Sequence, residues 1–324
     1  MDSIYSILER FNEDLLQFPA YVAAFNDIEG LLRLHRETGV AQHLLVLGES
    51  GTGKTTLCQD FVTRYPRVVL AERDVVPVLH VTIPPVATIA GVTEAMLARL
   101  GDPSPTTGTV SSKTARAVKL ARAVSVELLL IDEAQHIQDR GKLPTQYLVG
   151  DWLKTVMDEI GVPTVLLGLP RVGNLLQVNE QVRRRFSRRR YLQMGQHGET
   201  SVEEECLQLF LSLGDNFPIP VSCGSVGWKE MAQRVYYACD GRVAYIKKLL
   251  SGAIRIALEQ QLPHVGLETL EAAFTREVWW EGIDQLNPFN EQFQFRRLIQ
   301  PNEPFEQALA APSRIRAKER RDCL

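Results

Sequence analysis

The 324-residue sequence has few cysteines, and none of them forms a CxxC pair of the kind that holds zinc. The cysteines number five, which is odd, and they lie far apart at positions 58, 206, 223, 239 and 323. We therefore expect neither a disulfide framework nor a zinc ribbon. Sparse, unpaired cysteines are typical of a reducing compartment, so the sequence predicts a cytoplasmic protein.

Long apolar runs are also missing. The longest, such as Val162–Leu169, fall far short of the roughly 20 residues that cross a membrane. The first residues include Asp2, Glu9 and Arg10 and contain no uninterrupted apolar core, so no signal peptide is expected. The sequence predicts no association with a membrane.

An excess of positive charge is absent as well. The chain carries 36 lysines and arginines against 39 acidic residues, a net charge of −3. Any contact with nucleic acid must therefore come from a local basic patch. The hydrophobic fraction of 45% and the charged fraction of 23% are ordinary for a globular protein and exclude a disordered or collagen-like chain.

Short apolar runs alternate with helical patterns in the first two hundred residues. The expected strands are His43–Leu47, Pro77–Ile83, Glu127–Ile131 and Pro163–Gly168. The helical patterns between them are Thr55–Tyr65, Ile89–Leu100, Lys113–Val124 and Val149–Ile160. Continuous apolar runs suit strands that are buried on both faces, so the alternation predicts an α/β fold with a mostly parallel sheet.

The remaining segments suggest four parts of the chain. Beyond residue 197 only helical patterns occur, at Val202–Leu213, Lys229–Asp240, Val243–Gln260 and Leu267–Glu277. We expect N-terminal helices over 1–40, an α/β domain over 41–197, a small helical domain over 198–281 and a tail over 282–324. The tail is rich in Gln, Asn, Pro and Arg, which favours an extended, candidate partner-binding segment.

A phosphate-binding loop follows the first strand. Gly48-Glu49-Ser50-Gly51-Thr52-Gly53-Lys54-Thr55 matches G-x-x-x-x-G-K-[ST] in full and opens a helical pattern. The glycines allow the backbone to direct N–H groups at phosphates, and the helix N-terminus adds its positive dipole end. Lys54 would reach the β- and γ-phosphates, and Thr55 would bind Mg²⁺. The alternative, a glycine-rich turn, does not account for the strand and helix on either side.

Two carboxylates end the third strand, in Leu130-Ile131-Asp132-Glu133. The carboxyl end of a parallel strand is where such sheets bind ligands. Asp132 would hold Mg²⁺ and Glu133 would orient the attacking water. The alternative is a pair of exposed acids that cap the next helix. No histidine or cysteine lies three or four positions from His136, so we interpret it as a surface or supporting histidine.

Arginines are concentrated after the fourth strand, where residues 183–190 read Arg-Arg-Arg-Phe-Ser-Arg-Arg-Arg. One of Arg184, Arg185 or Arg188, with Arg185 favoured, could supply charge to a γ-phosphate held by a neighbouring subunit. The alternative is a solvated basic surface anchored by Phe186. Arg242, after Gly241, is a candidate arginine of the helical domain that closes on the nucleotide, or simply a residue at a helix start.

A stretch without acidic residues runs from Pro103 to Val126. It carries Lys113, Arg116 and Lys119 at steps of three, which drift about 60° around a helix at each step. Positive charge of this kind suits contact with the phosphate backbone of DNA and gives little sequence readout. The alternative is a solvated helix face.

In this order, the motifs resemble an AAA+ ATPase and, within that superfamily, the transposition regulators of the TniB/TnsC kind. The resemblance covers about residues 20–255. Its more specific parts are Leu44–Ser50 leading into Gly53-Lys54-Thr55-Thr56, then Gly161–Val165 and Arg185-Phe186. It implies an AAA+ P-loop fold with a parallel sheet core and a small helical lid, and a phosphate loop that includes Thr56.

The resemblance also implies a function. Such proteins bind ATP with Mg²⁺, assemble as rings or filaments on double-stranded DNA with little sequence specificity, and recruit or activate a transposase. Hydrolysis of ATP then drives disassembly, and a TniQ-like adaptor is often a further partner. This chain has Leu169 where the family commonly has a polar sensor residue, so we expect slow, assembly-dependent hydrolysis.

Two other interpretations remain open at this point. The protein could be an AAA+ loader or remodeller of another DNA or protein substrate. It could also be a nucleotide-switched scaffold that binds protein through the tail and does not bind DNA. DNA affinity that falls with salt concentration would favour the transposition regulator.

Overall fold

The computed structural model describes residues 3–13, 18–85, 87–139, 143–178, 180–194, 201–213 and 217–306. Contacts within the chain define two units, which are described separately. The α/β unit contains Asp27–Leu47 and Lys54–Arg190. The helical unit contains Met1–Asn26, Gly48–Gly53 and Tyr191–Glu306.

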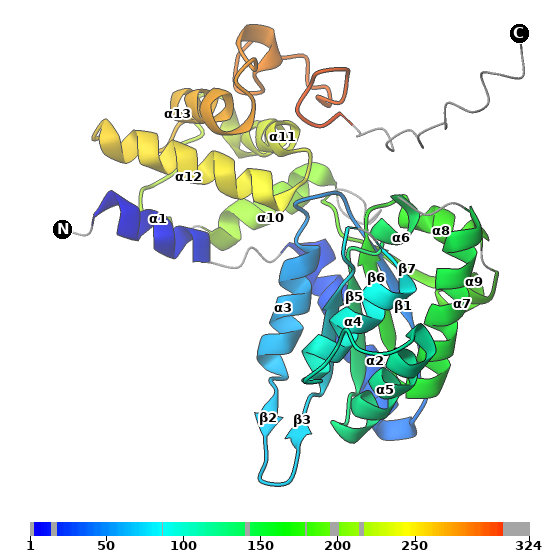
Figure 1. Cartoon of the computed structure of the whole chain (residues 1–324). Helices are drawn as coiled ribbons and strands as arrows, with labels where there is room; N and C mark the ends of the chain where they lie inside the picture. Colours follow the sequence, from blue (N-terminus) through cyan, green and yellow to red (C-terminus); the bar gives the residue numbers. More distant parts are fainter. Residues whose placement is uncertain are drawn as a thin grey trace, which may run out of the picture. The chain divides into compact units, whose positions relative to one another are not determined.

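The α/β unit is built on a five-stranded sheet with the order β4-β5-β6-β1-β7 (Figure 1). Its strands are β1 (Leu44–Leu47), β4 (Val78–Thr82), β5 (Leu128–Asp132), β6 (Thr164–Gly168) and β7 (Arg188–Tyr191). The pairs β4–β5, β5–β6 and β1–β6 are all parallel. The four strands expected from the apolar runs are therefore confirmed, and so is the α/β fold with a mostly parallel sheet.

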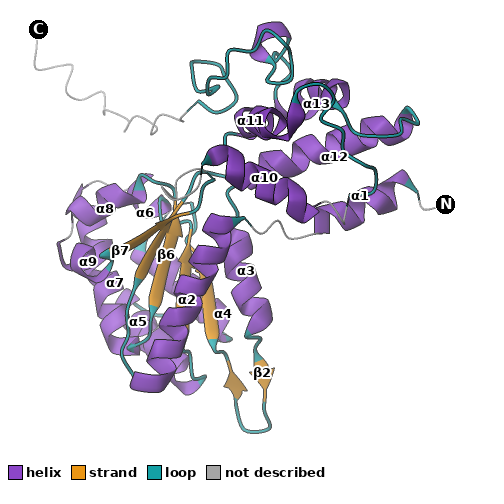
Figure 2. Cartoon of the chain, turned by 180° about the vertical axis from the view of Figure 1, so that it is seen from behind, coloured by secondary structure: helices purple, strands orange, loops and turns teal. Residues whose placement is uncertain are grey.

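Burial explains why these runs form strands. Every residue of β1, β5 and β6 is buried, so these segments are continuously apolar instead of alternating, apart from Asp132 at the end of β5 and Thr164 at the start of β6. One core cluster joins the sheet to several helices of this unit. They include α4 (Ile89–Leu100), α5 (Val110–Ala123), α7 (Leu143–Ile160), α8 (Val172–Val178) and α9 (Glu180–Arg185). Seen from opposite sides, Figures 1 and 2 place α4 and α2 on opposite faces of the sheet.

Several short elements of the α/β unit were not expected. Strand β7 lies within the arginine-rich run, whose charged side chains hide it from an apolar pattern. An antiparallel hairpin of β2 (Val68–Val69) and β3 (Asp74–Val75) extends beyond the end of α3 (Lys54–Arg64) (Figure 1). The one-turn helix α6 (His136–Asp139) follows β5. Elements this short leave too few residues to establish a period.

The helical unit contains α10 (Val202–Leu213), α11 (Gly227–Cys239), α12 (Val243–Glu259) and α13 (Leu267–Ala273), close to the predicted ranges. The chain then continues as a π-helical turn, η2 (Phe274–Val278). Helix α1 (Ile4–Glu13) packs on α12, where Lys247 Nζ donates a 2.7 Å hydrogen bond to the carbonyl of Asn12.

The N-terminal forty residues are divided between the two units. Helix α2 (Pro19–Thr38) begins in the helical unit and belongs to the α/β unit from Asp27 onward. There Asp27 binds Arg190 and Arg36 binds Glu127. This grouping differs from the predicted N-terminal segment 1–40, and the four-part division of the chain stays a prediction.

The first part of the expected tail is packed into the helical unit. Residues 282–306 have little regular structure beyond the 3₁₀ turn η3 (Asp284–Leu286). They nevertheless bury Phe289, Phe293, Leu298 and Phe305. The basic end, Arg314–Arg321, lies outside the described residues. None of the described helices combines the length and the low charge that a membrane-spanning helix needs.

Candidate nucleotide site

The structure brings Thr55 and Asp132 together at the carboxyl edge of the sheet. Thr55 lies in the first turn of α3 and Asp132 is the last residue of β5. The Thr55 hydroxyl donates a 2.7 Å hydrogen bond to Oδ2 of Asp132, whose side chain is fully buried. A hydroxyl and a carboxylate are the hard oxygen ligands that Mg²⁺ prefers. The residues therefore fit a magnesium ion.

Glu133 follows in a backbone conformation that few residues adopt. Its φ is +59°, and its N–H donates a 2.8 Å hydrogen bond to Oδ1 of Asp132. Such left-handed backbone in a residue other than glycine costs of order 1–3 kcal/mol and is concentrated at functional sites. Glu133 is half-buried at this position. His136 Nε2 lies 3.6 Å from the Glu133 carboxylate, a supporting position.

Gln135 was missed at the sequence level. Its side chain is buried, donates to the Glu133 carboxylate through Nε2, and accepts from the Leu169 N–H at 3.2 Å through Oε1. It thus joins the acidic end of β5 to the residue that follows β6. The Leu169 side chain has no polar atom, but its backbone N–H is part of this link. The sequence feature that could have identified Gln135 is its position, two residues after the carboxylates Asp132 and Glu133.

The phosphate loop Gly48–Gly53 is part of the helical unit, and Lys54 and Thr55 begin α3 in the α/β unit. Gly51 and Gly53 have φ of +81° and +95°, which favours glycine. A Cβ added at Gly51 would lie 2.9 Å from that of Ala244. Thr52 is buried and donates to the Glu49 carbonyl at 2.9 Å. Lys54 is buried at the start of α3, and Thr56 after it is exposed.

Arg242 lies beside this loop, within the helical unit. It is the N-cap residue of α12, and two residues later the Ala244 N–H donates a 2.9 Å hydrogen bond to the Gly51 carbonyl. Arg242 is 9% exposed, and its guanidinium carbon lies 5.2 Å from the Phe305 ring centroid. Among the described residues, its Nε has no hydrogen-bond partner. Its Nη2 lies 3.5 Å from Oδ2 of Asp240.

Asp240 connects Arg242 to the segment 282–306. Its buried carboxylate accepts two hydrogen bonds from Arg297, at 2.7 Å from Nε and 3.0 Å from Nη2. This hydrogen-bonded carboxylate raises the pKa of Arg297 against the opposing effect of burial. Arg297 and Phe305 therefore hold Asp240 and Arg242 in place, and neither was selected from the sequence.

The arginine cluster is partly engaged inside its own unit. Arg185 makes a bidentate ion pair with Asp158, at 2.6 and 2.7 Å from Nη2. Arg184 and Arg188 are exposed, and Arg188 lies 3.6 Å from Asp27. A role of Arg185 towards a neighbouring subunit requires the pair with Asp158 to open, and that role stays a prediction.

The expected DNA-binding stretch is also partly neutralised by the fold. Lys113 is buried and lies 2.5 Å from Glu94, and Arg116 pairs with Asp102. Arg116 also donates to the carbonyls of the loop before α5. Lys119 is exposed. The pairing acids lie outside the stretch of residues 103–126, so the sequence pattern did not reveal them. The DNA contacts stay a prediction.

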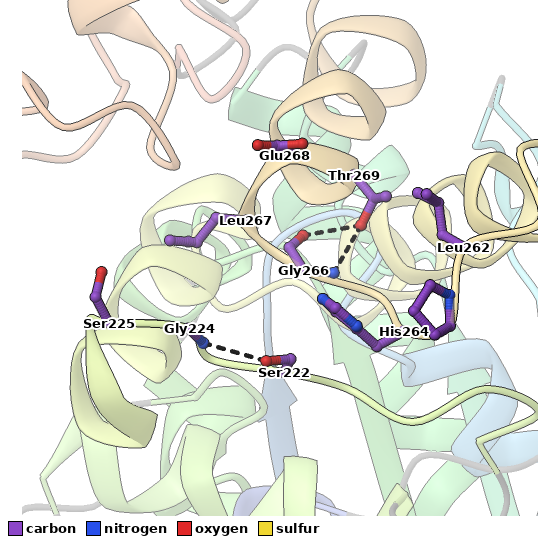
Figure 3. Close-up of a pocket in the computed structure, with 10 residues that line it drawn as sticks. Ser222, Gly224, Ser225, Leu262, His264, Gly266, Leu267, Glu268 and Thr269 are labelled. Atoms are coloured by element: carbon purple, nitrogen blue, oxygen red, sulfur yellow. Dashed lines mark hydrogen bonds between the residues drawn. The ribbon is translucent and has the colours of Figure 1, made fainter.

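The helical unit also contains a pocket, and its lining differs from that of the phosphate loop. The pocket has a volume of about 350 Å³ and lies between the segment before α11 and the segment before α13 (Figure 3). Its described lining includes His264 and Glu268 but neither lysine nor arginine. A lining without lysine or arginine does not suit a triphosphate, and the loop stays the predicted nucleotide site.

Comparison with known proteins identifies the family and the fold. The model of the family described as bacterial TniB protein matches residues 7–196. No curated protein matches the sequence. Among solved structures, the chain is similar to Cdc6p from Pyrobaculum aerophilum, with 13% identity and a TM-score of 0.59 over 82% of this chain and 69% of that chain.

Two structures from Aeropyrum pernix are also similar. The Orc1 protein in complex with DNA is 15% identical, with a TM-score of 0.56 over 82% of this chain and 68% of that chain. The Orc2 protein in its ADP form is 14% identical, with a TM-score of 0.58 over 84% of this chain and 73% of that chain. At these identities the likeness establishes the fold, that of an AAA+ ATPase.

Proposed function

Because the chain belongs to the TniB family of bacterial proteins, we propose that it is an ATP-dependent, DNA-binding regulator of DNA transposition. It would assemble on target DNA and recruit or activate a transposase, and ATP hydrolysis would drive disassembly. The observation that carries the nucleotide part is the hydrogen bond between Thr55 and Asp132, which places a phosphate-loop hydroxyl against a buried carboxylate.

Different residues of the site would bind the phosphates and the magnesium ion of ATP. The backbone of Gly48–Gly53, including Glu49, Ser50 and Thr52, would receive the phosphates, and Lys54 would balance the charge of the β- and γ-phosphates. Thr55 and Asp132 would hold Mg²⁺, with Thr56 completing the first turn. Magnesium supplies charge neutralisation at the transferred phosphate.

Hydrolysis requires a positioned water. Glu133 would orient it, and the hydrogen bond that Gln135 donates to the Glu133 carboxylate supports this role. Arg242 would meet the nucleotide from the helical unit, beside Gly51. Arg185 of an adjacent subunit would add positive charge at the γ-phosphate. Turnover that needs a neighbour would be slow in the monomer.

The proposed partners are double-stranded DNA, further copies of this chain, a transposase and a TniQ-like adaptor. Family membership supports them, and the similar Orc1 protein was solved in complex with DNA. The four described cysteines carry free thiols, which supports a reducing compartment such as the cytoplasm.

A scaffold that never contacts DNA is the second candidate. The internal pairs of Lys113 with Glu94 and of Arg116 with Asp102 favour it, because they remove two charges from the expected DNA surface. The tail would then bind the protein partner.

Two binding measurements separate these candidates. Titration with a fluorescent ATP analogue should give saturable binding to the wild type. Lys54→Ala should weaken this binding about 100-fold or more, which corresponds to about 2.7 kcal/mol of binding free energy. The exposed Lys229→Ala is the control. Unchanged affinity in Lys54→Ala would contradict the site.

The second measurement is the fluorescence anisotropy of labelled duplex DNA. The anisotropy should rise on addition of protein only when nucleotide is present, and the DNA affinity should fall as the salt concentration rises. Saturable nucleotide binding without DNA binding at low salt would favour the scaffold.

A further inference from the structure

Three side chains of different chemistry meet beneath the phosphate-loop helix. Cys58 comes from α3, His80 from β4 and Asp132 from β5. One ligand atom of each, a sulfur, a nitrogen and an oxygen, lies within 4.8 Å of the other two. Cys58 and Asp132 are fully buried, and the His80 side chain is only 12% exposed.

His80 is the least satisfied of the three. Its Nε2 is buried and has no hydrogen-bond partner among the described residues. It lies 3.9 Å from Oδ2 of Asp132, beyond hydrogen-bond distance. An imidazole nitrogen without a hydrogen-bond partner can bind a metal through its lone pair when the ring is neutral.

Cys58 completes a donor set that magnesium does not prefer. A cation that binds the Cys58 sulfur would replace the proton of the thiol, and that proton would leave to solvent. Soft sulfur together with imidazole nitrogen selects thiophilic metals over Mg²⁺.

We propose that Cys58, His80 and Asp132 form a binding site for a thiophilic divalent cation of the zinc class. Tetrahedral zinc places its ligand atoms about 3.3–3.8 Å apart, so small side-chain rotations close the observed spacing. The fourth position would hold a water. This binding does not depend on any role in nucleotide hydrolysis.

Occupancy of this site has a consequence that rests on the proposed function. Oδ2 of Asp132 accepts the Thr55 hydroxyl, and the same oxygen faces His80 Nε2. A cation held by the three side chains draws that oxygen away from Thr55 and from magnesium. The zinc-bound protein should therefore hydrolyse ATP poorly.

The binding test uses the metal-free full chain and Co²⁺ as a spectroscopic stand-in for zinc. Titration should produce a thiolate-to-cobalt charge-transfer band that saturates at one equivalent and is displaced by Zn²⁺. Cys58→Ser should lose the band, and His80→Gln should weaken binding about tenfold or more. Cys223→Ser, which changes a cysteine of the helical unit, is the matched control. A missing band in the wild type, or a band unchanged in Cys58→Ser, would overturn the proposal.

The inhibition test measures ATP turnover with excess Mg²⁺ and rising Zn²⁺. Turnover of the wild type should fall and recover when a chelator is added, whereas Cys58→Ser and His80→Gln should resist the same zinc. Bound zinc with unchanged turnover would overturn the inhibitory role alone. A cobalt band in a protein that never hydrolyses ATP would instead contradict the proposed function and leave the metal site standing.

Discussion

The Thr55 hydroxyl and the Asp132 carboxylate are joined by a 2.7 Å hydrogen bond although 77 positions separate them in the sequence. The pair lies at the carboxyl edge of the sheet, where α3 begins and β5 ends. Because both groups are oxygen ligands, their meeting point defines where magnesium and the β- and γ-phosphates would lie. The roles assigned to Lys54 and Glu133 follow from this position.

Glu133→Gln should bind ATP and fail to turn it over. The amide retains the shape and the hydrogen bond to Gln135 but cannot accept a proton from water. Loss of such a group reduces rate about 100-fold or more. Steady-state phosphate release and analogue titration, with the exposed Glu72→Gln as control, check this result. Normal turnover in Glu133→Gln would assign water activation to another residue.

Arg185→Ala should leave nucleotide binding by the monomer unchanged and reduce only the hydrolysis that depends on assembly. Arginines supplied in trans are worth about 10³-fold or more in related phosphoryl transfer. The comparison variant is Arg184→Ala, an exposed neighbour on α9. Turnover should be measured against protein concentration. If Arg184→Ala shows the larger loss, the trans role belongs to Arg184.

Arg297→Gln should weaken ATP binding although residue 297 lies outside the predicted nucleotide motifs. The change leaves the buried Asp240 carboxylate with Arg242 as its partner, so Arg242 is drawn away from the loop. Loss of the two hydrogen bonds from Arg297 to the buried Asp240 carboxylate should also cost about 1–3 kcal/mol of stability, measurable by urea unfolding. Arg296→Gln, which breaks the pair with Glu303, is the control. Equal ATP affinities of the two variants would refute the positioning role.

Stability should fall in mild acid because of His43. Burial lowers the pKa of His43 from 6.5 to about 4, and its Nδ1 accepts the Thr164 N–H at 3.1 Å. The unfolded chain takes up a proton below pH 6.5, which the folded protein resists until about pH 4. Between pH 7 and pH 5 this group should lower the unfolding free energy by about 2 kcal/mol.

Urea unfolding at the two pH values checks this loss. His43→Asn supplies an acceptor that does not titrate, so its stability should depend less on pH than that of the wild type. His264→Asn, in the helical unit, should retain the wild-type dependence. Identical pH profiles for His43→Asn and wild type would assign the acid sensitivity to other groups.

The sequence predicted most of the sheet, the phosphate loop and the acidic end of β5, because each of these depends on a local pattern. Strands that are buried on both faces consist mainly of consecutive apolar residues, so β1, β5 and β6 were evident. Parallel strands bring their carboxyl ends to one edge, so Asp132 was expected near Thr55. Glycines at positive φ and a lysine at a fixed offset made the loop recognisable.

The rest depends on residues that only folding brings together. Glu94, Asp102 and Asp158 neutralise basic residues that look unpaired in the sequence. Strand β7 is charged, so no apolar run marks it. The contact of Arg297 with Asp240 spans 57 positions and follows no period. Long-range ion pairs of this kind leave no local signal.

Electron microscopy of the purified chain on duplex DNA tests the central claim, which is nucleotide-dependent assembly on DNA. Samples would contain ATP, a non-hydrolysable analogue or no nucleotide. The account predicts rings or filaments on DNA with either nucleotide and none without it, most stable with the analogue. Monomers under all three conditions would contradict assembly on DNA and favour a nucleotide-switched scaffold that binds protein.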